Sequence, residues 1–289
     1  MLLFVDLDGV VYRGRDPVPG VAAVLAARVA MGDQVVYVTN LATSHRSDYL
    51  AKLEGMGAPV SLERIMSSAR ATALYLAHAD PPVNRVLVVG APGLRRELEE
   101  VGLEVLAAGD RAAVLAERQA EAASAGTRVD EDEVTGRPDA VVVGLDPEFT
   151  YGRMAVASMA IRNGSRFVAT NRDPALPTEG SFRPGAGACV AAIETASGVT
   201  PVSLGKPAPE VLEVAAQSVG KHATDGIMIG DGLNTDIAAA KSAGARSILM
   251  LTGITTRAQY DALAVDQRPD EVAEDAAALA VVLDRLAQG

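Results

Sequence analysis

Short apolar runs rich in valine and isoleucine alternate along the chain with longer, alanine-rich segments whose apolar residues recur every three or four positions. The first two runs cover 2–6 and 35–40, and the segment between them, 18–32, has the spacing of an amphipathic helix. Further runs lie at 85–91, 140–146, 166–171, 201–206, 226–231 and 246–253. Strands that alternate with helices form a parallel sheet with helices on both faces. The pattern therefore predicts an α/β protein with a doubly wound parallel sheet.

A polar segment at 107–137, rich in Glu, Asp, Ala and Gly, interrupts this alternation. We interpret it as an excursion on the surface. A chain of 289 residues that is 49% hydrophobic can bury one large core or two smaller ones. A single sheet of that many strands is possible, but the interruption favours two domains.

The chain has a formal net charge of -11, and only 3% of its residues are aromatic. A charge of this sign repels phosphate backbones and anionic membranes, although a local site can still hold a small anion. The scarcity of aromatic residues also argues against stacking platforms for single-stranded nucleic acid. We therefore expect no nucleic-acid or membrane partner.

The single cysteine, Cys189, excludes an internal disulfide and is typical of a small buried residue. The three histidines, His45, His78 and His222, are too scattered to suggest a zinc cluster. No basic segment precedes Asp6 and no apolar run approaches the length of a membrane span, so we expect neither a signal peptide nor a transmembrane helix. These features predict a cytoplasmic protein.

Polar side chains stand where the predicted strands end, and in open parallel sheets ligands bind beyond the carboxyl ends of the strands. The strand ends supply carboxylates, a hydroxyl, an amide and an ammonium, from Asp6 and Asp8, Thr39 and Asn40, Lys206, and Asp231. Together these groups are the components of a phosphoryl-transfer site.

Asp6 and Asp8 are two positions apart and can face the same ligand from an extended segment. Two close carboxylates resist ionising together unless a cation joins them, and Mg²⁺ takes oxygen ligands of this kind. Asp231 would supply a third oxygen. One aspartate could then attack phosphorus, while the second donates a proton to the leaving oxygen and later activates water.

Four further positions complete this hypothesis. Gly9 keeps the turn open, and Thr39 and Asn40 can donate hydrogen bonds to phosphoryl oxygens. Lys206 can offset the negative charge that the aspartyl and phosphoryl groups share in the transition state. The expected substrate is accordingly a small-molecule phosphate ester.

Each feature also has an ordinary explanation. An Asp-x-Asp-Gly turn is common loop chemistry, Thr39 and Asn40 could cap the following helix, and Lys206 could be a solvated residue before a helix. Asp231 and Asp236 could likewise be turn and helix N-terminal acids. The turn is not an EF-hand loop, because valine and proline stand where that loop needs glycine and glutamate. No G-x-G-x-x-G fingerprint is complete, so a dinucleotide site is not expected. The specific signal is the joint placement of these residues at strand ends, in this order.

In that order the residues resemble the four motifs of the haloacid dehalogenase superfamily phosphatases. The matching segments are DLDGVVYRG (6–14), VTN (38–40), GKPAPEVL (205–212) and GDGLNTDIAAAKSAG (230–244). The subclass that the chain resembles contains the NagD-like and p-nitrophenyl phosphatases. This resemblance implies a Rossmann-like core at 1–81 and 201–289, with an α/β cap domain inserted at 82–200.

The resemblance also implies a role for each motif residue. Asp6 would be the nucleophile and Asp8 the general acid and base, while Thr39 and Lys206 stabilise the phosphoryl group. Mg²⁺ would be bound by Asp6, Asp231 and the backbone carbonyl of Asp8. The resemblance places Asp236 behind these groups, where it would orient Lys206 or a metal-bound water.

The cap of this subclass is implied to close over the leaving group. Substrate choice would then depend partly on the loop 171–177, with Asn171 and Asp173 as candidate contacts, although the same loop could be a proline-stiffened turn. Caps of this subclass often pair, which makes a homodimer through the cap possible.

Two departures from the family pattern bear on the substrate. Leu41 and Ala42 stand where many relatives have an asparagine and a serine, which weakens the case for a nucleotide. Ala175 and Leu176 stand where the pyridoxal phosphate phosphatases have bulky rings, so a contact that grips a ring is not expected. A smaller or aliphatic ester fits better.

The sequence therefore predicts a Mg²⁺-dependent phosphatase that hydrolyses small sugar, glycerol or nucleotide phosphates through an aspartyl-phosphate intermediate. A phosphotransferase or mutase of the same superfamily is one alternative. A non-catalytic phosphate-sensing module is another, because receiver domains also combine aspartate, Mg²⁺, threonine and lysine on a parallel sheet. Such a module would not need Asp8 or a second domain.

Overall fold

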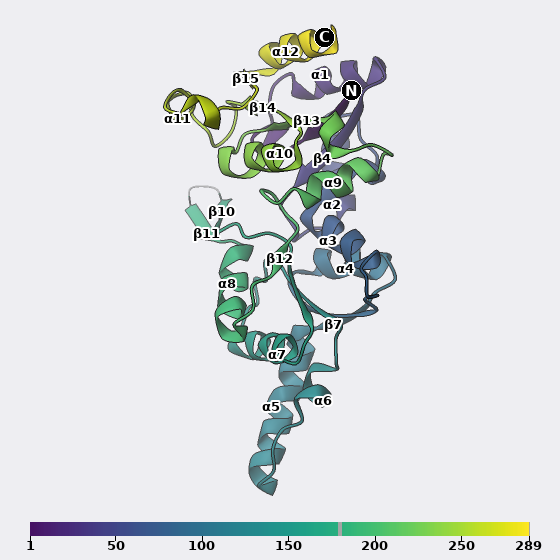
Figure 1. Cartoon of the computed structure of the whole chain (residues 1–289), viewed down its shortest axis with the longest axis vertical. Coiled ribbons are helices and arrows are strands. Elements are labelled where there is room, and N and C mark those ends of the chain that lie inside the picture. The colour runs from purple at the N-terminus through teal and green to yellow at the C-terminus, as the bar shows by residue number, and fades with distance from the viewer. Residues whose placement is uncertain (179–180, 289) are drawn as a thin grey trace. The chain divides into compact units, whose positions relative to one another are not determined.

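The computed structural model describes residues 1–178 and 181–288, which form two compact units (Figure 1). The first unit comprises Met1–Asn40, Arg46–Ser67 and the chain from Gly205 onward; the second comprises Leu41–His45 and Ser68–Leu204. Each unit is built around its own parallel sheet. The predicted fold class, a doubly wound α/β core with an additional α/β domain, is confirmed.

The sheet of the first unit has six parallel strands in the order β15-β14-β13-β1-β4-β5. Their bounds are β1 (Leu2–Val5), β4 (Gln34–Thr39), β5 (Ile65–Ser67), β13 (Gly226–Gly230), β14 (Arg246–Met250) and β15 (Glu271–Ala273). Val5 of β1 lies opposite Tyr37 on one side and Ile229 on the other. The register therefore brings the carboxyl ends of β1, β4 and β13 to one edge of the sheet.

Helices and a small hairpin complete the first unit. The helices are α1 (Val21–Ala30), α2 (Arg46–Gly55), α9 (Glu210–Gln217), α10 (Ala238–Ala243), α11 (Arg257–Asp261) and α12 (Ala276–Gln288). The hairpin joins β2 (Tyr12–Arg13) to β3 (Asp16–Pro17). In α12, Ala276, Leu279 and Leu283 are buried, which is the spacing of one helix face.

The sheet of the second unit has five parallel strands in the order β12-β9-β8-β6-β7. Their bounds are β6 (Arg85–Val89), β7 (Glu104–Ala107), β8 (Ala140–Val143), β9 (Arg166–Ala169) and β12 (Val202–Ser203). An antiparallel pair, β10 (Ala175–Thr178) and β11 (Ser181–Pro184), belongs to the same unit. The helices are α3 (Ser68–Ala77), α4 (Pro92–Glu100), α5 (Ala108–Ala125), α6 (Glu131–Thr135), α7 (Tyr151–Arg162) and α8 (Ala186–Ser197).

The second sheet buries both faces because its central strands β6, β8 and β9 are apolar at every position except the arginines that begin β6 and β9. Leu87 and Val141 pack in one core with residues of α5, α7 and α8. Their neighbours Val86 and Val142 pack in another core with residues of α3 and α4. Alternate strand residues point to opposite faces, so a continuous apolar run is what a sheet covered on both sides requires.

The unit boundaries differ from those expected at 81/82 and 200/201. Ala69 and Leu76 of α3 lie in a core of the second unit, and Val202 of β12 pairs with Val168 of β9. Residues 68–81 and 201–204 therefore belong to the second unit. The sequence shows that a helix or strand has an apolar face, but it does not show which of two sheets that face covers.

Other expectations also changed in detail. The polar segment 107–137 is not only a surface excursion, because it contains α5 and α6 and buries Leu115 and Val134 in a core. The strand expected at 246–253 ends at Met250. Residues 251–255 instead form a turn.

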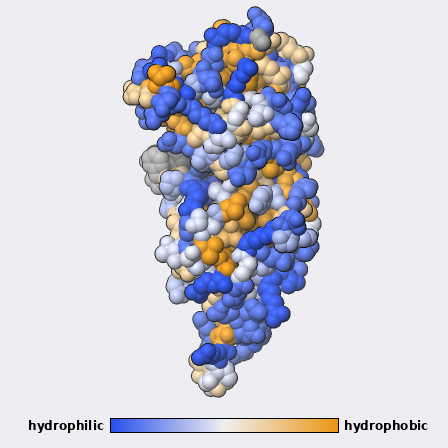
Figure 2. Space-filling model, viewed as in Figure 1, coloured by the Kyte–Doolittle hydropathy of each residue, from blue (hydrophilic) through white to orange (hydrophobic). Residues whose placement is uncertain are grey.

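On the face drawn in Figure 2, hydrophilic residues cover most of the surface and apolar residues occur in scattered groups. None of the helices within residues 1–178 and 181–288 combines the length and hydropathy that crossing a bilayer would need.

Candidate active site

A group of buried polar side chains lies at the edge of the first sheet where β1, β4 and β13 end. Asp6 follows β1, Thr39 is the last residue of β4, and Asp231 follows β13. All three are buried, and the backbone N–H of Asp6 donates to the carbonyl of Ile229 at 2.9 Å. The sheet itself therefore places residues that are far apart in the sequence beside one another.

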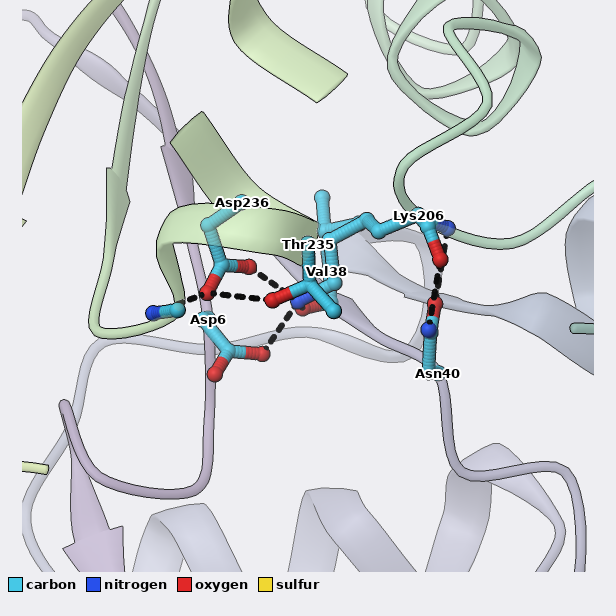
Figure 3. A network of polar contacts seen from close by, with 7 residues as sticks. Asp6, Val38, Asn40, Lys206, Thr235 and Asp236 are labelled. Carbon is cyan, nitrogen blue, oxygen red and sulfur yellow. Dashed lines mark hydrogen bonds and ion pairs between the residues drawn. The ribbon is translucent and has the colours of Figure 1, made fainter. Parts of the chain in front are cut away.

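Lys206 joins Asp6 of this group to Asp236 (Figure 3). Its Nζ donates to Oδ1 of Asp6 at 2.6 Å, to Oδ1 of Asp236 at 2.5 Å and to the carbonyl of Val38 at 3.3 Å. A lysine ammonium has three N–H donors, so these three acceptors satisfy it fully. Burial by itself lowers the pKa of Lys206, but Asp236 and Asp6 outweigh it and raise that pKa above its ordinary value. Lys206 is therefore a fixed positive charge.

The main chain at Lys206 is held by Asn40 (Figure 3). The amide Nδ2 of Asn40 donates to the carbonyl of Lys206 at 2.9 Å, and its Oδ1 accepts from the N–H of Lys206 at 2.8 Å. The two bonds join the end of β4 to the loop before α9. This positioning role was not expected from the sequence, which suggested that Asn40 contacts substrate.

Asp236 uses both of its carboxylate oxygens. Oδ1 accepts from Lys206, while Oδ2 accepts from the N–H of Gly232 at 2.9 Å and from the hydroxyl of Thr235 at 3.3 Å. Its side chain is almost completely buried. Asp236 thus links the segment after β13 to the lysine.

The site holds more negative than positive charge. Oxygens of Asp6, Asp231 and Asp236 lie within 4.8 Å of one another, with Lys206 as their cationic partner. Burial, followed by the nearby Asp236, raises the pKa of Asp231 to about 6. Burial also raises the pKa of Asp6, against the opposing effect of Lys206. When all three acids are ionised, they and the one ammonium have a net charge of -2, which a divalent cation would balance.

Asp8 differs from the other acids because its side chain is exposed. Its side chain is not among the three carboxylates that lie close enough to share a cation. An exposed carboxyl can exchange protons with solvent, as a general acid and base must.

Gly9 allows a close approach between the loop after β1 and Asp231. Its φ is +82°, which favours glycine, and a Cβ built on it would lie 2.0 Å from Oδ2 of Asp231. A side chain at this position would therefore displace the aspartate.

The segment Thr252–Thr255, which was not among the site residues predicted from the sequence, contacts Gly9 and Asp231. The hydroxyl of Thr252 donates to the carbonyl of Gly9 at 2.6 Å, and the N–H of Ile254 donates to Oδ2 of Asp231 at 2.7 Å. The available signal was the threonine-glycine pair, Thr252 and Gly253, that ends the predicted strand 246–253.

Asn171 and Asp173 belong to the second unit, where they follow β9. Asn171 is buried, its Nδ2 donates to the hydroxyl of Thr170 at 3.3 Å, and its Oδ1 accepts from the N–H of Asp173 at 3.1 Å. This is the local turn chemistry expected of asparagine. A substrate contact from either residue stays a prediction.

The chemistry that the first unit offers is phosphoryl transfer. A buried carboxylate lies against a fixed ammonium, beside further acids that can hold a cation, and an exposed acid follows two residues later. These groups suit a carboxylate nucleophile, charge stabilisation and proton transfer.

Comparison with known proteins agrees with this chemistry. A family model for haloacid dehalogenase-like hydrolases matches residues 3–104, and a second model, described as HAD-hydrolase-like, matches residues 203–279. The acid sugar phosphatase of Staphylococcus saprophyticus is 30% identical over 257 residues, which are 89% of this chain and 88% of that protein.

Two solved structures are similar to this chain over nearly its whole length. The p-nitrophenyl phosphatase from Archaeoglobus fulgidus has a TM-score of 0.82 and 28% identity, over 97% of this chain and 98% of that one. The glycerol phosphate phosphatase from Mycobacterium tuberculosis, solved in complex with magnesium, has a TM-score of 0.78 and 34% identity, over 96% of this chain and 76% of that one. The chain therefore belongs to the haloacid dehalogenase-like hydrolase family, among its p-nitrophenyl phosphatase-like members.

Proposed function

We propose that the protein is a Mg²⁺-dependent phosphatase that hydrolyses small phosphate monoesters through an aspartyl-phosphate intermediate. The observation that carries the proposal is the buried group of three carboxylates around one lysine, which lacks two positive charges. The names of the similar proteins, which act on sugar phosphates, glycerol phosphate and p-nitrophenyl phosphate, support the same reaction.

Mg²⁺ would be held by the carboxylates of Asp6 and Asp231 and by the backbone carbonyl of Asp8. Hard oxygen donors of this kind suit Mg²⁺, and the charge of the buried group suits a divalent ion. When bound, the ion neutralises the carboxylates and the phosphoryl oxygens, so that an anionic nucleophile can approach an anionic substrate.

Asp6 is the proposed nucleophile. Lys206 holds one of its oxygens and keeps the group oriented, and a carboxylate oxygen of Asp6 forms a bond to phosphorus while the bond from phosphorus to the ester oxygen breaks. Asp8 gives its proton to the departing alkoxide, which leaves as an alcohol.

The second half of the reaction returns Asp6 to its starting state. Asp8, now a carboxylate, takes a proton from a water molecule as the water attacks phosphorus. The bond between phosphorus and Asp6 breaks, and inorganic phosphate leaves. Because Asp8 is exposed, it can exchange its proton with solvent between cycles.

Thr39 and Lys206 are the proposed stabilisers of the transferring group. Thr39 ends β4 beside Val38, whose carbonyl accepts from Lys206, so the hydroxyl and the ammonium come from adjacent parts of the same edge. The hydroxyl of Thr39 would donate to a phosphoryl oxygen. The charge of Lys206, whose three N–H groups are already bonded, would offset the negative charge that develops on the phosphoryl group. Asp236 orients Lys206, and Asn40 holds its backbone.

A small or aliphatic ester is the substrate class that we propose. Leu41 and Ala42 follow the second motif without polar groups for a nucleotide, and Ala175 and Leu176 of the loop 171–177 provide no ring to stack on a large aromatic group. In the same proposal, Asn171 and Asp173 of that loop contact the substrate, and the second unit acts as the cap.

The experiment that tests this function measures phosphate release from sugar phosphates, glycerol phosphates, phosphoglycolate, nucleoside monophosphates and pyridoxal phosphate, with Mg²⁺ or with EDTA. We expect release that depends on Mg²⁺ and is concentrated on small aliphatic esters. The variant Asp6→Asn should fold like the wild type and lose at least about a thousandfold in turnover, because its amide is no nucleophile.

Other outcomes would point to other functions. Transfer of phosphate to a sugar hydroxyl, in place of release to water, would indicate a phosphotransferase or mutase. A stable phosphoprotein formed from acetyl phosphate, with no turnover of any ester, would indicate a sensing module. Turnover by Asp6→Asn at a level near that of the wild type would rule out the aspartyl-phosphate mechanism.

The cellular compartment and the oligomeric state of the enzyme are also proposals. The single buried Cys189 suits a reducing cytoplasm. A homodimer through the second unit is proposed from the resemblance alone, and light scattering on the purified protein would measure the mass in solution.

A further inference from the structure

The segment Thr252–Thr255 contacts both sides of the proposed metal site. It follows β14, which lies beside β13 in the first sheet, so it reaches the same sheet edge as Asp231. The hydroxyl of Thr255 donates to the backbone carbonyl of Asp231 at 2.5 Å, and the N–H of Ile254 donates to the Oδ2 of that residue at 2.7 Å. Main chain and side chain of Asp231 are therefore held by two neighbouring residues.

The same segment also holds the loop after β1. The hydroxyl of Thr252 donates to the carbonyl of Gly9 at 2.6 Å, and the carbonyl of Thr252 accepts a hydrogen bond from Nε of Arg13. Asp6 and Asp8 belong to this loop, so the segment links the two parts of the chain that would provide metal ligands.

The packing around Asp231 leaves no room for the carboxylate to move toward the backbone. A Cβ built on Gly253 would lie 1.7 Å from Oδ2 of Asp231, and a Cβ built on Gly9 would lie 2.0 Å from the same atom. The carboxylate thus lies against the backbones of two glycines, and the N–H of Ile254 gives it its direction. An aspartate held in this way has already lost the freedom that it would otherwise lose on binding a cation.

We propose that Thr252 and Thr255 are positioning residues for Mg²⁺, because their hydroxyls hold the Gly9 loop and Asp231 in the arrangement that binds the ion. The proposal rests on the proposed role of Asp231 as a metal ligand. Both hydroxyls are buried and bonded to backbone carbonyls, so each transmits its effect through the ligand-bearing chain and not by touching substrate.

The test uses threonine-to-valine substitutions, which remove the hydroxyl and keep the shape of the side chain. The variants are Thr255→Val, Thr252→Val and the rescue variant Thr255→Ser, which restores a hydroxyl. Thr72→Val is the matched control, because the buried hydroxyl of Thr72 also donates to a backbone carbonyl, that of Ser68 at 2.7 Å, but within a helix of the second unit. The measurement is calorimetric titration of the metal-stripped full chain with Mg²⁺ alone.

We expect Thr255→Val and Thr252→Val to weaken Mg²⁺ binding by about 10- to 100-fold, the usual effect of removing a group that orients a metal ligand. Thr255→Ser should bind within about twofold of the wild type, and Thr72→Val should leave the Kd unchanged. At saturating Mg²⁺ the valine variants should regain most of their kcat, which a general loss of structure would not allow.

Unchanged Mg²⁺ affinity in both folded valine variants would overturn the inference. If one valine variant fails to fold, the other variant and Thr255→Ala give the same measurement. Asp231→Asn separates this inference from the proposed function: wild-type affinity in Asp231→Asn, or no Mg²⁺ binding by the wild type, would overturn the proposed metal site and the inference together.

Discussion

Lys206 is the residue on which the charge balance of the site depends. It is the cationic partner of both Asp6 and Asp236, and it is almost completely buried. A buried ion pair need not add stability relative to apolar residues, but removal of one partner leaves a buried charge without compensation. We therefore expect the lysine to affect both the stability of the metal-free protein and the proposed chemistry.

Lys206→Met keeps the length of the side chain and removes its charge. In EDTA we expect the free energy of unfolding, measured with urea, to fall by about 3–5 kcal/mol, because Asp6 and Asp236 lose their partner. Phosphatase turnover should be lost as well. Lys241→Met is the control, because Lys241 is exposed and donates to a backbone carbonyl at the surface. Equal stability of the two variants would contradict the role assigned to Lys206.

The raised pKa of Asp231 predicts how the metal-free protein responds to pH. Burial raises this pKa from 3.8 to about 6 in the folded protein, so the folded protein retains a proton that the unfolded chain has already lost. The associated stability is fully present below about pH 4 and is lost as the pH rises through about 6. In EDTA, the contribution of Asp231 to the free energy of unfolding, taken as the difference between the wild type and Asp231→Asn, should therefore be about 2–3 kcal/mol larger at low pH than at neutral pH.

Asp231→Asn is the reference for this prediction. Subtracting its profile of unfolding free energy against pH from that of the wild type removes the effect of the net charge of -11. Excess Mg²⁺ should reverse the trend, since the ion binds the ionised carboxylate and competes with the proton. Urea unfolding at several pH values, with EDTA and with Mg²⁺, provides the measurement. Identical pH profiles of wild type and variant in EDTA would refute the prediction.

At the scale of elements, the strand ends were predictable and the connections were not. Apolar runs with polar ends predicted β1, β4 and β13, because a strand that is buried on both faces is a continuous run of apolar residues. The short edge strands β5, β7 and β15 were not predicted as strands, since three or four residues carry little periodicity. The helix α4 shows a further limit of prediction from the sequence, because a contact with a distant part of the chain requires its Gly93.

Gly93 of α4 packs against the backbone of residues 43–45, which belong to the same unit. A Cβ built on it would lie 2.4 Å from the carbonyl carbon of Ser44. In an isolated helix, alanine is about 1 kcal/mol better than glycine, but here we expect Gly93→Ala to destabilise the protein by about 1–3 kcal/mol. Gly55→Ala is the control, because Gly55 ends α2 with nothing within 4 Å of its built Cβ. Urea unfolding of both variants should give opposite signs.

At the scale of the whole molecule, two units with separate cores share one chain. The chain enters the second unit after Asn40 and again at Ser68, and returns to the first at Gly205. The proposed catalytic groups Asp6, Thr39, Lys206 and Asp231 all belong to the first unit, whereas the loop proposed for substrate choice belongs to the second. In the proposed function, chemistry and substrate choice therefore depend on different cores.

Leu87→Ala tests this separation. Leu87 is fully buried in a core of the second unit, so we expect a loss of about 2–5 kcal/mol in the free energy of unfolding. The Kd for Mg²⁺ should stay the same, because effects at sites without shared partners add independently. Calorimetric titration and urea unfolding of one preparation measure both quantities. A Kd raised tenfold would show that the second core also determines the metal site.

The sequence by itself determined the α/β class, the strand ends that carry polar groups and the residues proposed for the chemistry, because periodicity and motif spacing are local properties of the chain. Only the tertiary structure decided which unit α3 and β12 join, that Asn40 holds the backbone of Lys206, and that Thr252 holds Gly9. The last two contacts join residues 166 and 243 positions apart. Hydrogen bonds of this range depend on the register of the assembled sheet, which no local pattern contains.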